Sequence, residues 1–204
     1  MEIIKKYPDL SWCWVIISLN RAVTTYIIEN NLDLPWDWEF GLSKNKNITI
    51  DFIKKYIDKQ WNWYYISRNS AITMDIIENN MDLPWDWEGI STNKNITINF
   101  IRKYIEKDWN WGYLSYNKAI TLDMIENNTD LPWDWYLISL NRYLTFDFIK
   151  KYPDKPWNWS WISARSIITL DIIKNNSDIP WDWDFFSANP NLTVEIIKKY
   201  PDKP

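Results

Sequence analysis

One motif, two tryptophans separated by a single residue, recurs along the whole chain and constrains its fold more than any other feature. The first tryptophans of consecutive motifs lie 24 residues apart in every interval except one, which spans 25. Repetition at a fixed period of this length is typical of units that stack on one another to form a continuous core. The eight motifs are Trp12/Trp14, Trp36/Trp38, Trp61/Trp63, Trp85/Trp87, Trp109/Trp111, Trp133/Trp135, Trp157/Trp159 and Trp181/Trp183.

Three polar positions follow each motif: a serine, an asparagine two residues later, and then a threonine. The serine lies six residues after the first tryptophan, except in the 25-residue interval, where it lies seven residues after it. The asparagine is replaced once, by Arg165. We therefore expect a single repeat domain over residues 1–204, with a partial unit at 1–11 followed by eight repeats of about 24 residues. The expected repeats are residues 12–35, 36–60, 61–84, 85–108, 109–132, 133–156, 157–180 and 181–204.

The threonine of each unit has the properties of a helix N-cap. Its hydroxyl can accept a hydrogen bond from a backbone amide in the first turn of the helix that follows. The residue before it is always aliphatic and the residue four after it is always isoleucine, as at Ile96 and Ile101 around Thr97. These two positions are the ends of a hydrophobic staple. One short helix is therefore predicted after each threonine.

The Trp-x-Trp segment predicts a second short helix. In the stretch Asp82–Trp85, an acid stands before a proline, which fits an N-cap followed by a first-turn proline. In a helix starting there, the two tryptophans would point to opposite sides. A helix that is apolar on two sides is one held between neighbours. The resulting fold prediction is all-α: an α-solenoid of eight repeats of about 24 residues, each made of two short helices.

A leucine-rich-repeat-like α/β solenoid is the alternative fold, because 24 residues is also a common repeat length there. The Ser-x-Asn pattern after an aliphatic residue matches part of that motif, whereas the Leu-x-Leu strand signature has no clean counterpart. The threonine cap and the Pro-Trp start favour helices.

Odd and even units differ, so the full period is about 48 residues. One helical position alternates in charge from Glu29 to Lys54 to Glu78 to Arg102, and the alternation is lost towards the C-terminus. Opposite charges are therefore expected to meet between adjacent units along most of the stack. Because each exposed pair contributes only about 0–1 kcal/mol, such pairs would select register rather than supply bulk stability.

Composition excludes several functions. The chain has no His and one Cys, so neither a Ser-His-Asp nor a Cys-His arrangement is possible. With 3 glycines it has no Gly-rich phosphate loop. We expect no catalytic residues, no metal site and no cofactor.

The formal charge of −4 argues against nucleic acid as a partner. No apolar run is long enough to span a membrane. The single Cys13 and a start without a secretory signal predict an intracellular protein.

The register Trp-(Asp/Asn)-Trp, Ile-Ser-x-Asn, Ile-Thr resembles uncharacterised tandem-repeat proteins of giant DNA viruses of the mimivirus type. The resemblance covers all eight units, through stretches such as PWDWEGISTNKNIT and PWDWYLISLNRYLT. It implies a viral source and a location in the host cytoplasm or the virion, and it implies no activity or binding residue.

Function is expected to reside where the units differ, because both tryptophan positions recur in every unit and are explained by core packing. The positions that vary after the second tryptophan and after the serine place Tyr64, Arg68, Tyr116 and Tyr136 on a candidate binding face. A non-catalytic scaffold for protein–protein interaction is the first hypothesis. The alternatives are a carbohydrate- or peptide-binding module that uses exposed aromatic residues, and a structural protein that polymerises end to end.

The ends show no polar capping repeat, since Ile3 and Ile4 at the start and Ile196 and Ile197 near the end are ordinary core-type residues. We expect these side chains to be exposed, because no further unit covers them. Head-to-tail self-association, or membership of a longer array, is therefore expected.

Overall fold

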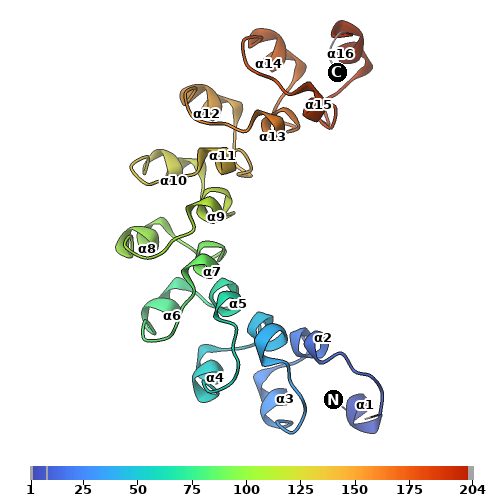
Figure 1. The fold of residues 1–204 in the computed structure, drawn as a ribbon, viewed down its shortest axis with the longest axis vertical. Helices are drawn as coiled ribbons and strands as arrows, with labels where there is room; N and C mark the ends of the chain where they lie inside the picture. Colours follow the sequence, from blue (N-terminus) through green and yellow to red (C-terminus); the bar gives the residue numbers. More distant parts are fainter. Residues whose placement is uncertain (1, 8, 202–204) are drawn as a thin grey trace. The chain divides into compact units, whose positions relative to one another are not determined.

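The computed structural model describes residues 2–7 and 9–201 and consists of short helices joined by turns (Figure 1). Two kinds of helix alternate along the chain. The Trp helices begin at the second tryptophan of each motif, and the Thr helices begin directly after the repeated threonine. No strand occurs among the described residues. The expected all-α solenoid of two-helix repeats is confirmed, and the leucine-rich-repeat alternative is not supported.

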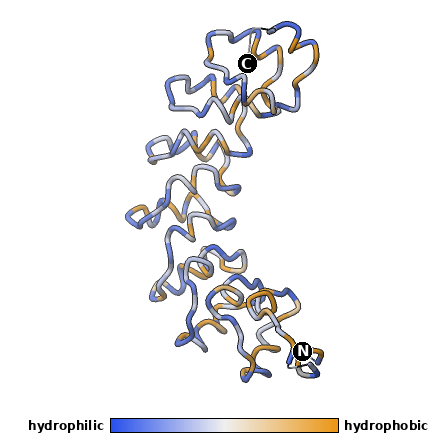
Figure 2. Tube along the Cα trace, turned by 45° about the vertical axis from the view of Figure 1, so that its right-hand side comes forward, coloured by the Kyte–Doolittle hydropathy of each residue, from blue (hydrophilic) through white to orange (hydrophobic). Residues whose placement is uncertain are grey.

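The chain divides into two compact units, residues 1–110 and 111–204. In the first, α1 (Glu2–Lys6) precedes the Trp helices α2 (Trp14–Leu19), η1 (Trp38–Leu42), α5 (Trp63–Arg68) and α7 (Trp87–Ser91), and the Thr helices α3 (Thr25–Glu29), α4 (Ile50–Lys55), α6 (Met74–Glu78) and α8 (Ile98–Lys103). In the second, the Trp helices are α9 (Trp111–Tyr116), α11 (Trp135–Ile138), α13 (Trp159–Ser163) and α15 (Trp183–Phe186), and the Thr helices are α10 (Leu122–Glu126), α12 (Phe146–Lys151), α14 (Leu170–Asn175) and α16 (Val194–Lys199). Within each unit the two kinds form two adjacent rows (Figure 1), and hydrophobic and hydrophilic stretches alternate along the trace (Figure 2).

The Thr helices start as the sequence predicts. Each of the eight threonine hydroxyls accepts a hydrogen bond from the backbone N–H three residues later, at 3.2–3.4 Å. Both ends of the staple are buried in the first seven repeats, as with Ile96 and Ile101 around Thr97. The capping hydroxyl supplies a partner for an amide that the helix itself leaves unpaired.

The start of the Trp helices differs from the prediction. The N-cap is the residue between the two tryptophans, such as Asp86, whose carboxylate accepts from the N–H of Gly89. The acid–proline stretch Asp82–Trp85 lies outside the helix, and Trp85 precedes the cap. The two tryptophans therefore do not lie on opposite sides of one helix. Asp86 occupies the cap position because its own backbone N–H is fixed by Ser67 of the preceding repeat.

The one 25-residue interval is accommodated by a π-helical turn, η1. The backbone N–H of Leu42 donates to the carbonyl of Asp37, five residues earlier. The Ser43 hydroxyl likewise donates to the carbonyl of Trp38, five residues back, whereas Ser91 and Ser115 reach only four residues back. The extra residue is thereby taken up inside the helix, and Ser43 keeps its place in the stack. Insertion of a single residue into a helix commonly produces such a bulge.

Serine side chains join consecutive repeats. In seven repeats the serine hydroxyl accepts a hydrogen bond at 2.8–3.0 Å from the backbone N–H of the residue between the next pair of tryptophans. Ser18, Ser67, Ser91, Ser115, Ser139 and Ser163 are completely buried. The hydroxyl thereby supplies a hydrogen-bond partner to a backbone amide at the start of each following Trp helix.

The asparagine that follows binds the preceding repeat. The side-chain amide of Asn93 donates to the carbonyls of Ser67, Asn69 and Ile72, at 2.8–3.3 Å. Its carbonyl oxygen accepts from the N–H of Asn95, which fixes the turn. Arg165, the single exception to the asparagine pattern, retains this role, because its guanidinium donates to the carbonyls of Ser139 and Asn141 at 3.0 Å.

The tryptophans form the core between the repeats. Every first tryptophan donates its indole N–H to the carbonyl five residues earlier, at 2.7–2.9 Å. Seven second tryptophans pack edge-to-face on the first tryptophan of the next repeat, with centroids 5.0–5.6 Å apart. All 17 tryptophans are described and none is exposed. This explains why both positions recur in each unit.

The charge pairs between Thr helices involve different lysines from those expected. Glu29, Glu78 and Glu126 pair with Lys55, Lys103 and Lys151, each one residue beyond the position that the sequence pattern pointed to. Lys150 pairs with Asp147 on its own helix. Hydrogen bonds from Lys103 and Tyr104 lower the pKa of Glu78.

Cys13 is the one N-cap of a Trp helix that the structure shows without a side-chain cap hydrogen bond. Its backbone angles, φ −83° and ψ 97°, match those of the capped Asp37, at −84° and 100°. We expect Cys13→Asp to raise the free energy of unfolding by about 0.5–2 kcal/mol, because the carboxylate supplies the missing acceptor. Urea unfolding monitored by circular dichroism measures this. Cys13→Ala is the control, and equal midpoints for the two variants would contradict the prediction.

The two ends differ in how far the expected exposure holds. Ile3 is 65% and Ile197 57% exposed, but Ile196 is only 2% exposed, so the expectation was wrong for that residue. End-to-end association stays a prediction. Among the described residues, no helix has the length and apolar character needed to cross a membrane.

Candidate functional site

The repeated polar side chains are engaged in holding the stack together. The serines, asparagines and threonines of the framework bind backbone groups of their own or the preceding repeat, as shown above. Among the described residues, every buried side-chain nitrogen or oxygen atom has a hydrogen-bond partner. The groups left for recognition are therefore those at the variable, exposed positions.

The variable positions with the most distinctive composition lie in the seven-residue segments that run from the repeated serine to the repeated threonine, here termed the turn segments. None of the 27 acidic residues of the chain falls in any turn segment, although the chain as a whole is acidic. Their cations are Arg21, Lys44, Lys46, Arg68, Lys94, Lys118, Arg142 and Arg165. Arg165 is engaged in the stack, and the other seven are exposed. The turn segments of each compact unit therefore carry net positive charge.

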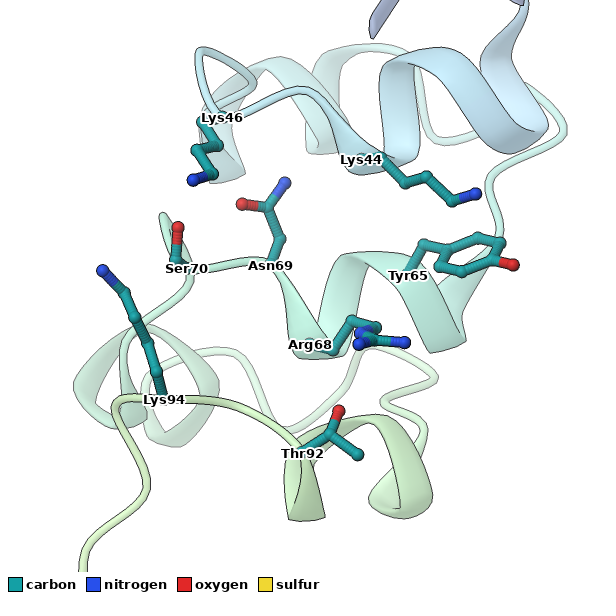
Figure 3. A pocket seen from close by; sticks show the side chains of 8 residues that line it. All are labelled: Lys44, Lys46, Tyr65, Arg68, Asn69, Ser70, Thr92 and Lys94. Carbon is teal, nitrogen blue, oxygen red and sulfur yellow. The ribbon is translucent and has the colours of Figure 1, made fainter. Parts of the chain in front are cut away.

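In the first compact unit, three consecutive turn segments and α5 border an open groove of about 580 Å³, here termed the basic groove (Figure 3). Its lining contains four cationic side chains and no acidic one. Such a lining attracts anions because it carries positive charge without a lining carboxylate. The lining residues are Lys44, Lys46, Tyr65, Arg68, Asn69, Ser70, Thr92 and Lys94.

Two of the groove cations rest on aromatic rings. The Lys44 ammonium lies 3.8 Å from the centroid of the Tyr65 ring. The Arg68 guanidinium lies 5.4 Å from the Tyr64 ring centroid and donates to the Tyr64 hydroxyl at 3.2 Å. Cation–π contacts at such distances are favourable and restrict side-chain rotation. Arg68 is therefore partly pre-oriented before any ligand arrives.

Asn69 separates the basic groove into two halves. Lys44, Tyr65 and Arg68 lie on one side of it, and Lys46, Ser70 and Lys94 lie on the other (Figure 3). Asn69 itself is buried, and its amide donates to the Asn45 carbonyl of the neighbouring repeat at 3.0 Å. The floor of the groove is thus part of the repeat framework, and the cations project from a rigid base.

The four residues expected on the binding face are only partly brought together. Tyr64 and Arg68 contact each other, and Arg68 lines the basic groove. Tyr116 and Tyr136 belong to the second compact unit, where Tyr116 packs against Tyr113 and Tyr136 against Trp161. Sequence reasoning did not assign Lys44, Lys46 and Lys94 to the site. The absence of acids from the turn segments is the signal that could have identified them.

The chemistry that this arrangement supports is the binding of anionic groups. Among the described residues, no group of three or more His, Cys, Asp or Glu side chains is placed to hold a metal ion. The lack of catalysis stays a prediction that rests on the absence of His from the sequence. Comparison of the chain with protein-family models, with curated proteins and with solved structures finds no match.

Proposed function

We propose that the chain is a non-catalytic repeat scaffold that binds a protein partner through the basic groove. The observation that carries this proposal is the acid-free set of turn segments, which places four cations around one open groove in a chain of net charge −4. A framework whose polar groups bind one another leaves these variable side chains as the groups available to a partner. The resemblance to giant-virus repeat proteins, and a location in the host cytoplasm or virion, stay predictions.

A carbohydrate-binding function has less support, because sugars stack on open aromatic faces. The first tryptophans are mostly buried, and the second tryptophans pack against the next repeat. In the basic groove, the Lys44 ammonium occupies a face of the Tyr65 ring. The proposal therefore favours a protein partner over a glycan.

Affinity capture from native host extract with paired variants tests the proposal. The groove variant is Lys46→Glu/Lys94→Glu, and the control variant is Lys54→Glu/Lys198→Glu, which changes the net charge equally at exposed positions on Thr helices. We expect at least one protein to be captured by the unmodified chain and by the control variant but lost from the groove variant. If all three chains capture the same proteins, the basic groove is not the interaction surface.

A further inference from the structure

We infer that the basic groove recognises an acidic peptide segment, that is, a stretch of a partner protein carrying several carboxylates and bound in extended form. This inference rests on the proposed function and specifies its ligand.

The charge arrangement favours a ligand with more than one anionic group. Cations stand on both sides of Asn69, with Lys44 and Arg68 on one side and Lys46 and Lys94 on the other (Figure 3). A single small anion would meet only one of these pairs. A chain with spaced carboxylates can engage both, and each additional contact is made without a further loss of translational freedom.

The groove is open on the surface, so it leaves room for an extended chain rather than enclosing a small molecule. Hydroxyl groups accompany the cations. Thr92 donates its hydroxyl hydrogen to the Gly89 carbonyl at 2.8 Å, which leaves its oxygen able to accept from a backbone N–H. Arg68, held against Tyr64, presents a planar fork of donors that suits a carboxylate.

The aromatic rings at the groove argue against single-stranded nucleic acid, the other polyanion of this charge. Binding of unpaired bases relies on aromatic faces on which the bases stack. Here Lys44 lies over the Tyr65 ring and Arg68 over the Tyr64 ring. Lys44 thus covers one face of Tyr65, the one aromatic residue in the groove lining. An acidic peptide requires the cations and no stacking platform.

Fluorescence anisotropy with a defined probe tests the inference on the full chain. The probe is a short labelled peptide in which Glu alternates with Ser, and the matched probe has Gln at each Glu. We expect binding of the Glu peptide that weakens as salt is raised and no binding of the Gln peptide. The groove variant is expected to bind about tenfold or more weakly, and the control variant within about twofold of the unmodified chain. Circular dichroism establishes that both variants are folded.

The substitution Arg68→Lys tests whether binding requires the planar donors of the guanidinium group or only its positive charge. It keeps the positive charge but loses the planar donors, so we expect a loss of affinity of about threefold or more. Oligothymidine of the same length and inorganic phosphate serve as competitors, and both should displace the Glu peptide poorly.

Three results would overturn the inference: equal weakening by the groove and control variants, tighter binding of oligothymidine than of the Glu peptide, or no binding of the Glu peptide. The proposed function fails separately. If the groove variant loses a captured protein although the Glu peptide does not bind, the groove is an interface for a different ligand. If the Glu peptide binds but capture is unchanged, the scaffold proposal fails at this surface.

Discussion

Ile101→Ala is expected to lower the free energy of unfolding by about 2–5 kcal/mol, because it removes a fully buried side chain at the end of a hydrophobic staple. Ile101 has no solvent exposure and lies four residues after the capping Thr97. Truncation leaves a cavity between Thr helices that are themselves only one or two turns long. Such short helices depend on packing rather than on intrinsic propensity, so the cost is not absorbed locally. The midpoint of urea unfolding measures the effect.

Ile105→Ala is the matched control. Ile105 lies four residues further along the chain and is 47% exposed, so removing the same atoms there should cost well under 1 kcal/mol. Thr97→Ala is expected to fall between the two, at about 0.5–2 kcal/mol, because it removes a cap and leaves the core intact. If Ile101→Ala and Ile105→Ala shift the midpoint equally, burial at the staple does not hold the repeat together.

The features predicted correctly from the sequence are those decided within a few residues. A threonine followed three residues later by an unpaired amide defines its own cap, and the eight threonine caps all formed. The predicted start of the Trp helices lay too early in the sequence, because Asp82 and Pro84 also form a local helix-start signal. Asp86 became the cap instead, since its N–H is bound by Ser67, nineteen residues earlier. No local pattern contains that contact.

The ion pairs and the candidate site depend on how one repeat packs against the next. Glu29 pairs with Lys55, the residue that follows the expected Lys54 in sequence. The basic groove has the same origin, because Lys46 and Lys94 come from repeats that are two apart. Arg68 was assigned to the candidate binding face from the sequence, because it lies at a variable position directly after the repeated serine. Lys44, Lys46 and Lys94 share the acid-free pattern of the turn segments, but only the structure brings them around one groove with Arg68.

Asn93→Ala is expected to destabilise the chain by about 3 kcal/mol, comparable to the loss of a core side chain. The asparagine amide donates to three carbonyls of the preceding repeat, and Asn93 has no solvent exposure. Of these three, the Asn69 carbonyl also accepts from the N–H of Ile72, and the Ile72 carbonyl also accepts from the side-chain amide of Asn95, so the loss falls mainly on the Ser67 carbonyl. A buried carbonyl that loses its donor costs about 1–3 kcal/mol, and the turn also loses the acceptor that fixes Asn95. Urea unfolding again provides the measurement.

Two further variants show whether the donors themselves are responsible. Asn93→Asp keeps the shape and the acceptor oxygen that fixes the turn at Asn95, but it places a carboxylate against carbonyls, so it should be at least as damaging as alanine. Asn93→Arg should recover part of the loss, because Arg165 already binds two carbonyls at the same position of its own repeat. The guanidinium of Arg165 does so although burial lowers its pKa. If alanine, aspartate and arginine at position 93 have equal effects, the repeats are held by shape alone, and the amide hydrogen bonds between them contribute little.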